Sequence, residues 1–439
     1  MKILHITNND YDGAGRAVVR LHLSLLKHGV DSNVAVAFSK YQNDKVFKIG
    51  YGETKKQLFK DVFSLKTLVN FKVLIEILFF LKIRILEFLL IHIYKPEYLF
   101  NFNAGSSRYK KLKKYLIDCD VLVLHSIQNM LFPNEILRLY QEYNLKIIMH
   151  PLDMELITGG CHFNFNCEKW KNNCDNCFQL NSNYFKNYSN KIFLRKQLSY
   201  RDIPLHWVAT NNFVKKRLME SPLTNSIHRF SSIFLGVDEN RFFKIDKQIA
   251  RNELTLPIDK KIILFGCFNF LDDRKGAAPL KESLSNHFNE SDYENVCLVT
   301  FGERNGFSFE STKFEWKHLG MISTDFEMNN LYRAADILVS PSIDDLGPVI
   351  VQEAFMNELP IVAFDTGLAS DLVIENINGN LARCFDFNEL VRLVRNNILS
   401  TNKPNLSNPK LDKLLKECSS ESEAINFINE CFMNHKSLK

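Results

Sequence analysis

The chain has 439 residues, of which 46% are apolar and 24% charged, and its formal net charge is +5. This length exceeds one ordinary hydrophobic core and predicts two or three domains, while the composition excludes collagenous, coiled-coil and broadly disordered proteins. The charge is mild and forms no long Lys/Arg block, which argues against a nucleic-acid-binding protein and suits a phosphate-bearing substrate or an anionic membrane surface.

The first half of the sequence alternates predicted strands and helices. A strand at 2–7 leads through a glycine loop at 12–16 into a helix at 17–27 and a strand at 33–38. Further strands are predicted at 120–125, 146–150 and 205–210. This alternation predicts a doubly wound α/β domain. Met1 leads directly into the first strand with no apolar signal core, so we expect a cytoplasmic location, where the ten cysteines would be thiols or metal ligands.

The apolar segment 62–94, within a predicted helical insertion at 58–98, stands apart from this pattern. Glu76, Lys82, Arg84 and Glu87 interrupt its dense run of Leu, Ile and Phe. Four charges in about 20 residues argue against a membrane-spanning helix. Two alternatives stay open: a helix lying in the membrane surface, which would hold the protein at the inner face of the plasma membrane, and a buried helical hairpin.

A second alternating series follows residue 242. Strands are predicted at 261–266, 296–301, 336–340 and 359–364, and helices at 276–286, 325–335, 349–357 and 420–434. The simplest architecture is α/β, with two Rossmann-like doubly wound domains facing across a cleft. The expected boundaries are 1–238 for the first domain, 239–415 for the second and 416–439 for a C-terminal helix that returns to the first.

The glycine loop is a candidate anion site, because Gly13 and Gly15 follow a strand and open a helix whose amides and dipole attract anions. A dinucleotide fingerprint is not complete. Val18 occupies the third glycine position, and no acid ends the next strand. A plain tight turn is the alternative.

The second half carries two spaced acids. Asp345 lies in a loop after a predicted strand, and Glu353 lies eight residues later inside a predicted helix. Both carboxylates would reach the carboxyl edge of the sheet, where α/β proteins bind ligands, and carboxylates bind sugar hydroxyls well. The alternative is an acid that complements the helix dipole, followed by a solvated helix glutamate.

This run resembles the acid-x7-Glu signature of family 4 glycosyltransferases, which have the GT-B fold. The resemblance is strongest over 319–373 and includes Asp273-Arg274-Lys275-Gly276, similar to the basic element that neutralises the donor diphosphate. The sequence departs from the family at Phe268, where an Arg is common, and at Leu368, which replaces a frequent second glycine.

The resemblance implies a role for each matched residue. Glu353 would bind the donor ribose, and Asp345 with the amides of its loop, Gly347 included, would bind the sugar hydroxyls. Lys275, with Arg274, would hold the diphosphate and stabilise its developing charge. Retention at the anomeric carbon follows from the same resemblance.

In the first domain, the run from His150 through Asp153 to Thr158-Gly159-Gly160-Cys161-His162 resembles a subgroup of these enzymes that builds bacterial surface polysaccharides. The resemblance makes His150 a candidate beside the reacting sugar and Asp153 a candidate acceptor contact. His125, which ends another predicted strand, competes with His150. For either histidine, a core position is the alternative.

Four cysteines lie close together in the predicted Cys-rich loop 159–180. They are Cys161, Cys167, Cys174 and Cys177. Clustered thiolates in a cytosolic protein favour a closed tetrahedral zinc site with a structural role. Paired disulfides and free thiols stay open as alternatives.

Together these features predict a glycosyltransferase that moves a sugar from a UDP- or GDP-sugar to a saccharide or lipid-linked saccharide acceptor in bacterial cell-surface polysaccharide synthesis. It would need no cofactor for catalysis, because no Asp-x-Asp metal motif stands in a suitable place, and it would not bind nucleic acid. An NAD-dependent oxidoreductase, a nucleotide-sugar epimerase of GT-B fold and a non-catalytic partner subunit of a glycosyltransferase are the alternatives.

Overall fold

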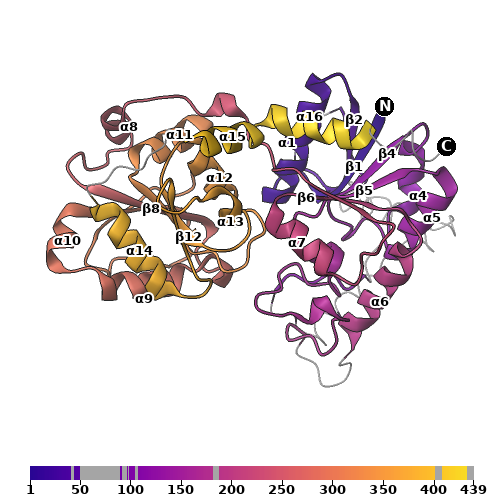
Figure 1. Cartoon of the computed structure of the whole chain (residues 1–439), viewed down its shortest axis with the longest axis horizontal. Helices are drawn as coiled ribbons and strands as arrows, with labels where there is room; N and C mark the ends of the chain where they lie inside the picture. The colour runs from indigo at the N-terminus through magenta and orange to yellow at the C-terminus, as the bar shows by residue number, and fades with distance from the viewer. Residues whose placement is uncertain are drawn as a thin grey trace, which may run out of the picture. The chain divides into compact units, whose positions relative to one another are not determined.

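The computed structural model describes residues 1–40, 44–49, 89–90, 96, 98–103, 107–180, 187–400 and 408–432. Its described residues form two compact units (Figure 1). The first comprises 1–210, 215–233 and the chain from Ala424, and the second comprises 211–214 and 234–423. The second unit therefore begins at Phe234, a little before the boundary expected at 239, and ends beyond the expected 415.

The first unit contains a seven-stranded sheet in the order β3-β2-β1-β4-β5-β6-β7. All its strand pairs are parallel. The strands are β1 (Lys2–Asn9), β2 (Asp31–Phe38), β3 (Val46–Lys48), β4 (Val121–Leu124), β5 (Lys146–Met149), β6 (His206–Ala209) and β7 (Arg229–Ser232). The helices along this part of the chain are α1 (Gly13–Lys27), α4 (Tyr109–Leu112), α5 (Pro133–Tyr143), α6 (Tyr188–Tyr200) and α7 (Asn212–Glu220). Every residue of β4 and β6 is buried, as expected for parallel strands covered on both faces.

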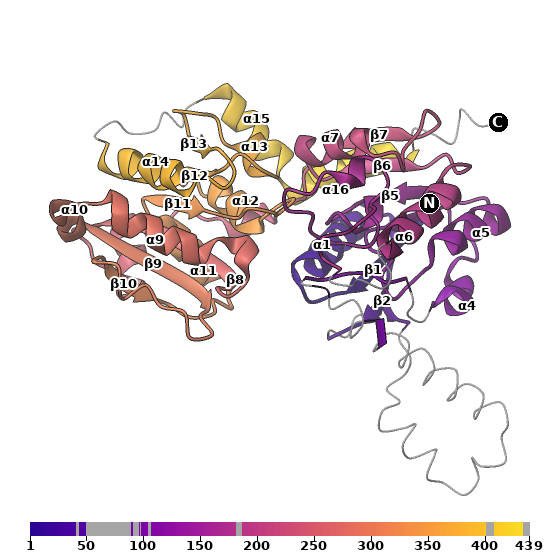
Figure 2. The same cartoon turned by 90° about the horizontal axis from the view of Figure 1, so that it is seen from below.

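The last helix, α16 (Ser420–Phe432), covers one face of this first sheet. Its residues Ala424, Phe427 and Cys431 share a core cluster with alternate residues of the strands, such as Ile3 and Val123. Figure 2 shows α16 in yellow near β5 and β6. Apolar side chains at this spacing give the helix one buried stripe, so α16 packs on the unit that contains the N-terminus.

The second unit contains a six-stranded parallel sheet in the order β10-β9-β8-β11-β12-β13. Its strands are β8 (Lys261–Asn269), β9 (Val296–Glu303), β10 (Glu315–His318), β11 (Ile337–Ser340), β12 (Ile361–Phe364) and β13 (Gly379–Ala382). Its helices are α8 (Lys247–Glu253), α9 (Ala277–His287), α10 (Glu290–Asn295), α11 (Asp325–Ala334), α12 (Val349–Met356), α13 (Ala369–Leu372), α14 (Phe387–Leu399) and α15 (Pro409–Glu417).

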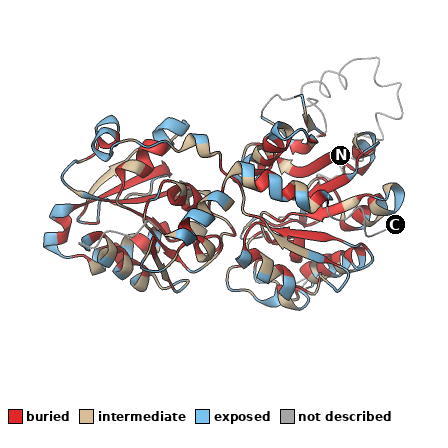
Figure 3. Cartoon of the chain, turned by 45° about the horizontal axis from the view of Figure 1, so that its top comes forward, coloured by how far each residue is buried: buried red, intermediate tan, exposed pale blue. Residues whose placement is uncertain are grey.

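Successive residues of the central strand β8 belong to two separate hydrophobic cores, one on each face of the sheet. Ile262 and Leu264 pack with residues of α8, α11 and α12, whereas Ile263 and Phe265 pack with residues of α9 and α14. Figure 2 shows α9 and α14 along this sheet, and Figure 3 shows its buried strands between helices with exposed outer faces. Side chains alternate across a strand, so a continuous apolar run requires helices on both faces. The expected fold of two Rossmann-like parallel α/β domains is confirmed.

Most of the insertion at 58–98, with its apolar segment 62–94, lies outside the described residues. The choice between a membrane-surface helix and a buried hairpin therefore stays a prediction. No helix in the described part of the chain has the length and apolar character that crossing a bilayer requires.

Candidate functional site

The acids and bases expected at the donor site lie together in the second unit. Arg274 and Lys275 lie in the connection from β8 to α9, Asp345 in the connection from β11 to α12, and Glu353 inside α12. β8 and β11 are hydrogen-bonded neighbours in a parallel sheet, so both connections leave from the same sheet edge. Ligands of open α/β sheets bind at this carboxyl edge.

Lys275 and Asp345 form an ion pair between Nζ and Oδ2. The other carboxylate oxygen of Asp345 accepts a hydrogen bond of 3.2 Å from the amide of Gly347. Burial alone would raise the pKa of Asp345, but the charges of Lys275 and Arg274 and these hydrogen bonds outweigh it, so its pKa lies below its usual range. Asp345 is therefore held ionised in a partly buried loop.

Arg274 joins the two connections. Its guanidinium forms an ion pair with Asp272 and donates a hydrogen bond of 3.2 Å to the carbonyl of Asp344, and its own carbonyl accepts one of 2.8 Å from the amide of Ile343. The resemblance leads one to expect an arginine at the position of Phe268. The side chain of Phe268 is exposed, with 71% of its surface accessible to solvent. Arg274 thus orders the acidic loop, residues 341–348 between β11 and α12.

Gly367 packs against the same acidic loop. It has a φ of +56°, and a side chain there would meet the carbonyl oxygen of Asp345 at 2.0 Å. This position therefore requires glycine. Leu368 is buried in the core of the second unit, which gives this departure from the family pattern a packing role.

Glu353 is held from two sides by residues that the sequence analysis did not single out. Its Oε2 accepts a hydrogen bond of 2.9 Å from the hydroxyl of Tyr332 on α11, and its Oε1 lies 3.5 Å from Nη1 of Arg241. Arg241 also forms an ion pair of 2.6 Å with Asp325. Tyr332 stood within the resembling stretch 319–373, but nothing in the local sequence connects Arg241 to an acid more than 100 positions away.

In the first unit, the candidate His150 lies inside the core. Side chains of a strand alternate between its two faces, and Ile3, Val123 and Ile148 lie on the face that α16 covers. Three histidines each follow one of them by two positions and so lie buried under the same helix: His5 on β1, His125 after β4 and His150 after β5. Nε2 of His125 lies 3.0 Å from Nδ1 of His5, and Nδ1 of His125 lies 3.0 Å from Nδ1 of His150. Phe427 of α16 packs on the ring of His150. Burial lowers the pKa of His150 to about 4. His150 and its competitor His125 are thus buried beneath α16 with lowered pKa values, and a role for either beside the reacting sugar stays a prediction.

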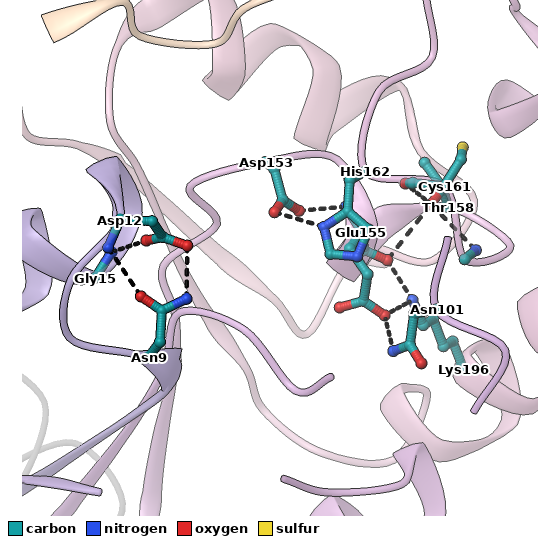
Figure 4. Close-up of polar contacts among 11 residues, drawn as sticks. Asn9, Asp12, Gly15, Asn101, Asp153, Glu155, Thr158, Cys161, His162 and Lys196 are labelled. Carbon is teal, nitrogen blue, oxygen red and sulfur yellow. Dashed lines mark hydrogen bonds and ion pairs between the residues drawn. The ribbon is translucent and has the colours of Figure 1, made fainter. Parts of the chain in front are cut away.

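The glycine loop has its helix N-terminus already capped. The Asp12 carboxylate accepts a hydrogen bond of 2.7 Å from the amide of Gly15, and Asn9 donates one of 2.6 Å to the same carboxylate (Figure 4). A side chain at Gly15 would meet the Asn9 carbonyl oxygen at 2.3 Å, whereas Gly13 faces open space. The structure thus gives this loop a tight-turn role, with its own acid where an anion would bind.

Asp153 forms an ion pair with His162 after β5. Its Oδ2 lies 2.8 Å from Nδ1 of His162, and its Oδ1 accepts a hydrogen bond of 2.8 Å from the amide of Glu155 (Figure 4). Burial opposes both charges, but their mutual attraction outweighs it, so the pKa of Asp153 is lowered and that of His162 is raised. About a quarter of the Asp153 side chain stays exposed, whereas His162 is buried.

A second, fully buried ion pair supports this segment. Lys196 on α6 lies 2.8 Å from Oε1 of Glu155, which also accepts a hydrogen bond of 2.9 Å from Asn101 (Figure 4). The two charges fix the short 3₁₀ helix Glu155–Ile157, directly beside Asp153, onto α6. The sequence pattern gave no indication of this pair.

The four clustered cysteines line one pocket, together with Phe100, Trp170 and Phe178. The amide of Gly159 donates a hydrogen bond of 3.1 Å to Sγ of Cys174. Burial raises the pKa of Cys174 to about 12. All ten cysteines are free thiols, and among the described residues no three His, Cys, Asp or Glu side chains are arranged to hold a metal ion. The four thiols thus lie close together but are not arranged as metal ligands, and the structural zinc site stays a prediction.

Comparisons with known proteins agree with the fold. Residues 246–408 match the family model described as glycosyl transferases group 1. Sucrose-phosphate synthase from Thermosynechococcus elongatus aligns over 98% of both chains, with a TM-score of 0.67 and 14% identity. HepE from Anabaena, solved in complex with UDP, aligns over 98% of this chain and 99% of its own, with a TM-score of 0.62 and 14% identity.

The lipopolysaccharide outer core galactosyltransferase WaaB in its apo form aligns over 98% of this chain and 99% of its own, with a TM-score of 0.58 and 12% identity. No curated protein matches the chain by sequence. The structural likenesses show a shared fold, and the family match covers the unit that contains the paired acids and Lys275. The two described units therefore have the fold of the GT-B glycosyltransferases, and residues 246–408 match a group 1 glycosyl transferase domain.

Proposed function

We propose that the enzyme transfers a sugar, with retention of anomeric configuration, from a nucleotide-diphosphate sugar to a saccharide or lipid-linked saccharide acceptor. The observation that carries the proposal is the ion pair of Lys275 and Asp345 at one sheet edge of the family-matched unit, with Glu353 on the helix that follows the loop of Asp345. UDP is the proposed nucleotide, because HepE binds UDP on the same fold. A role in bacterial surface polysaccharide synthesis rests on the sequence resemblance.

The chemistry requires a bond from the anomeric carbon to the diphosphate to break and a bond to an acceptor hydroxyl to form, with the acceptor proton ending on the leaving group or on water. Lys275 and Arg274 would compensate the charge that develops on the departing diphosphate. Glu353, oriented by Tyr332, would accept hydrogen bonds from the ribose. Asp345 and the amide of Gly347 would bind sugar hydroxyls.

On the acceptor side we propose Asp153 as the contact for an acceptor hydroxyl. Its carboxylate is ionised, partly exposed and fixed by His162 and by the amide of Glu155. A fixed acceptor of hydrogen bonds orients a hydroxyl at little entropic cost. Asp153→Asn should raise the acceptor KM and leave the donor KM unchanged.

The first test is the thermal stability of the purified enzyme with UDP-, GDP-, ADP- and dTDP-sugars, with NAD as a control. A ligand at a hundred times its Kd stabilises the folded protein by about 2.7 kcal/mol, which shifts the melting midpoint measurably. We expect a shift with a UDP-sugar that is lost in Glu353→Ala. A shift with NAD alone would overturn the proposal.

The second test follows the reaction of the UDP-sugar that gives a shift. The anomeric coupling constant of the product, measured by NMR, should match that of the donor. An inverted product would refute retention, and conversion of the donor sugar without any acceptor would identify an epimerase instead.

A further inference from the structure

The ion pair between Lys275 and Asp345 lies where the proposed donor would bring its diphosphate. Each of the two side chains is about one-fifth exposed, so water screens the pair only in part. Nζ of Lys275 contacts Oδ2 of Asp345, and Oδ1 of Asp345 accepts a hydrogen bond from the amide of Gly347. Both oxygens of this acid are therefore satisfied before any ligand arrives.

A bare nucleoside diphosphate would disturb this arrangement at a cost. If Lys275 turns from Asp345 to the phosphate, a partly buried carboxylate loses its counter-charge. If Lys275 keeps both partners, the carboxylate and the phosphate share one ammonium group and repel each other across it. Either outcome weakens binding, because like charges and uncompensated charges are both unfavourable in a partly desolvated site.

A nucleotide sugar would not meet this cost in full. The hydroxyls of its sugar can donate hydrogen bonds to Asp345 and so replace the lost contact with Lys275. A carboxylate that accepts hydrogen bonds from hydroxyl groups keeps its charge stabilised. The same acid therefore opposes one ligand and favours the other.

We propose that Asp345 is a specificity-determining residue that makes the donor site favour a nucleotide sugar over the nucleoside diphosphate that the reaction releases. This inference rests on the proposed function, because it takes Lys275 as the diphosphate contact. It adds that the pair with Lys275 disfavours retention of the product and so helps the product to leave.

The test is the affinity of UDP and of a UDP-sugar, measured by titration calorimetry on the wild type and on Asp345→Asn. The sugar used is the one that gives the largest thermal shift. We expect the variant to bind UDP roughly three- to tenfold more tightly and the UDP-sugar more weakly, because a competing charge and an acceptor of hydrogen bonds are lost together. The preference of the enzyme for the UDP-sugar over UDP should therefore fall in Asp345→Asn.

Two control variants separate this effect from general electrostatics. Asp345→Glu keeps the charge and should keep the weak binding of UDP. Glu282→Gln removes an exposed carboxylate of α9 outside the proposed site and should change UDP affinity less than twofold. Circular dichroism and the melting midpoint establish that each variant is folded.

An unchanged or weaker affinity of Asp345→Asn for UDP would overturn the inference while leaving the proposed function intact. A wild-type protein that binds neither UDP nor any nucleotide sugar would overturn the proposed function itself. If Asp345→Asn does not fold, Asp345→Ser measured in the same titration replaces it and decides the point by the same criterion.

Discussion

The hydroxyl of Tyr332 donates a hydrogen bond of 2.9 Å to Oε2 of Glu353, and both side chains are buried. Burial and the neighbouring Glu353 raise the pKa of Tyr332 well above its ordinary value, so its hydroxyl stays protonated and able to donate. The tyrosine thereby fixes one oxygen of the carboxylate proposed to bind the donor ribose.

Loss of this hydrogen bond should weaken donor binding selectively. We expect Tyr332→Phe to raise the donor KM about five- to thirtyfold, since a hydrogen bond to a charged group contributes roughly 1 to 2 kcal/mol. Glu353→Gln should lower kcat/KM about a hundredfold, or roughly 2.7 kcal/mol. Steady-state kinetics with varied donor measure both.

Tyr293→Phe is the matched control, because Tyr293 is a buried tyrosine of the same unit whose hydroxyl donates to the carbonyl of Phe288. It should leave the donor KM unchanged. A Tyr332→Phe enzyme with wild-type kinetics would show that Glu353 needs no orientation by the tyrosine.

The buried pair of Lys196 and Glu155 should matter for stability. Lys196→Met leaves the Glu155 carboxylate without a counter-charge, and we expect a loss of about 3 to 5 kcal/mol in the free energy of unfolding. The double variant Lys196→Met, Glu155→Leu should recover much of this loss, because it leaves no buried charge. Urea unfolding measures the difference.

Lys191→Met provides the control, since Lys191 is an exposed lysine of the same helix α6. It should change stability by less than about 0.5 kcal/mol. If the double variant is as unstable as Lys196→Met alone, the pair contributes through contacts other than charge compensation.

The buried His150 predicts a pH dependence of stability. Its pKa is lowered from 6.5 to about 4 by burial, so the unfolded chain takes up a proton at higher pH than the folded chain. The contribution of His150 to stability should therefore be constant above pH 6.5 and fall between pH 6.5 and 4. This histidine would account for on the order of 3 kcal/mol of that fall.

Melting midpoints across this pH range should show a smaller slope for His150→Asn, while the exposed His28→Asn keeps the wild-type slope. Activity at pH 7.5 distinguishes packing from catalysis. A packing role leaves kcat close to that of the wild type. A large fall in kcat in a folded His150→Asn enzyme would restore the catalytic role that the sequence resemblance implied.

The predicted zinc site is tested by metal analysis of protein purified without chelator. If the four clustered cysteines hold zinc, the protein should contain about one zinc per chain, and Cys174→Ser should lose it. Cys119→Ser, a buried thiol outside the loop, should keep the metal. Metal-free protein with ten titratable thiols after denaturation would contradict the prediction.

The sequence by itself was sufficient for the fold class and for most central elements. The strand predicted at 261–266 is β8, the helix predicted at 325–335 is α11, and the helix predicted at 420–434 is α16. These elements carry long apolar runs or a regular helical spacing, which local chemistry fixes. The short edge strands β3, β7, β10 and β13 were missed, because three or four residues hold too little pattern.

The same limits apply to the candidate site. Asp345, Glu353 and Lys275 could be proposed from the sequence because their motif is local and their strands are strongly apolar. Only the tertiary structure decided their partners. Arg241 reaches Glu353 across more than 100 positions of sequence.

The histidines show the opposite case. The sequence placed His150 at a strand end, where substrates are often bound, but the face to which it points depends on what covers the sheet. The C-terminal helix α16 covers it, with Phe427 on the imidazole ring. Residue types and local spacing therefore determined which chemistry this protein carries, whereas long-range packing decided which of those groups stay accessible, because burial is set by segments far apart in the chain.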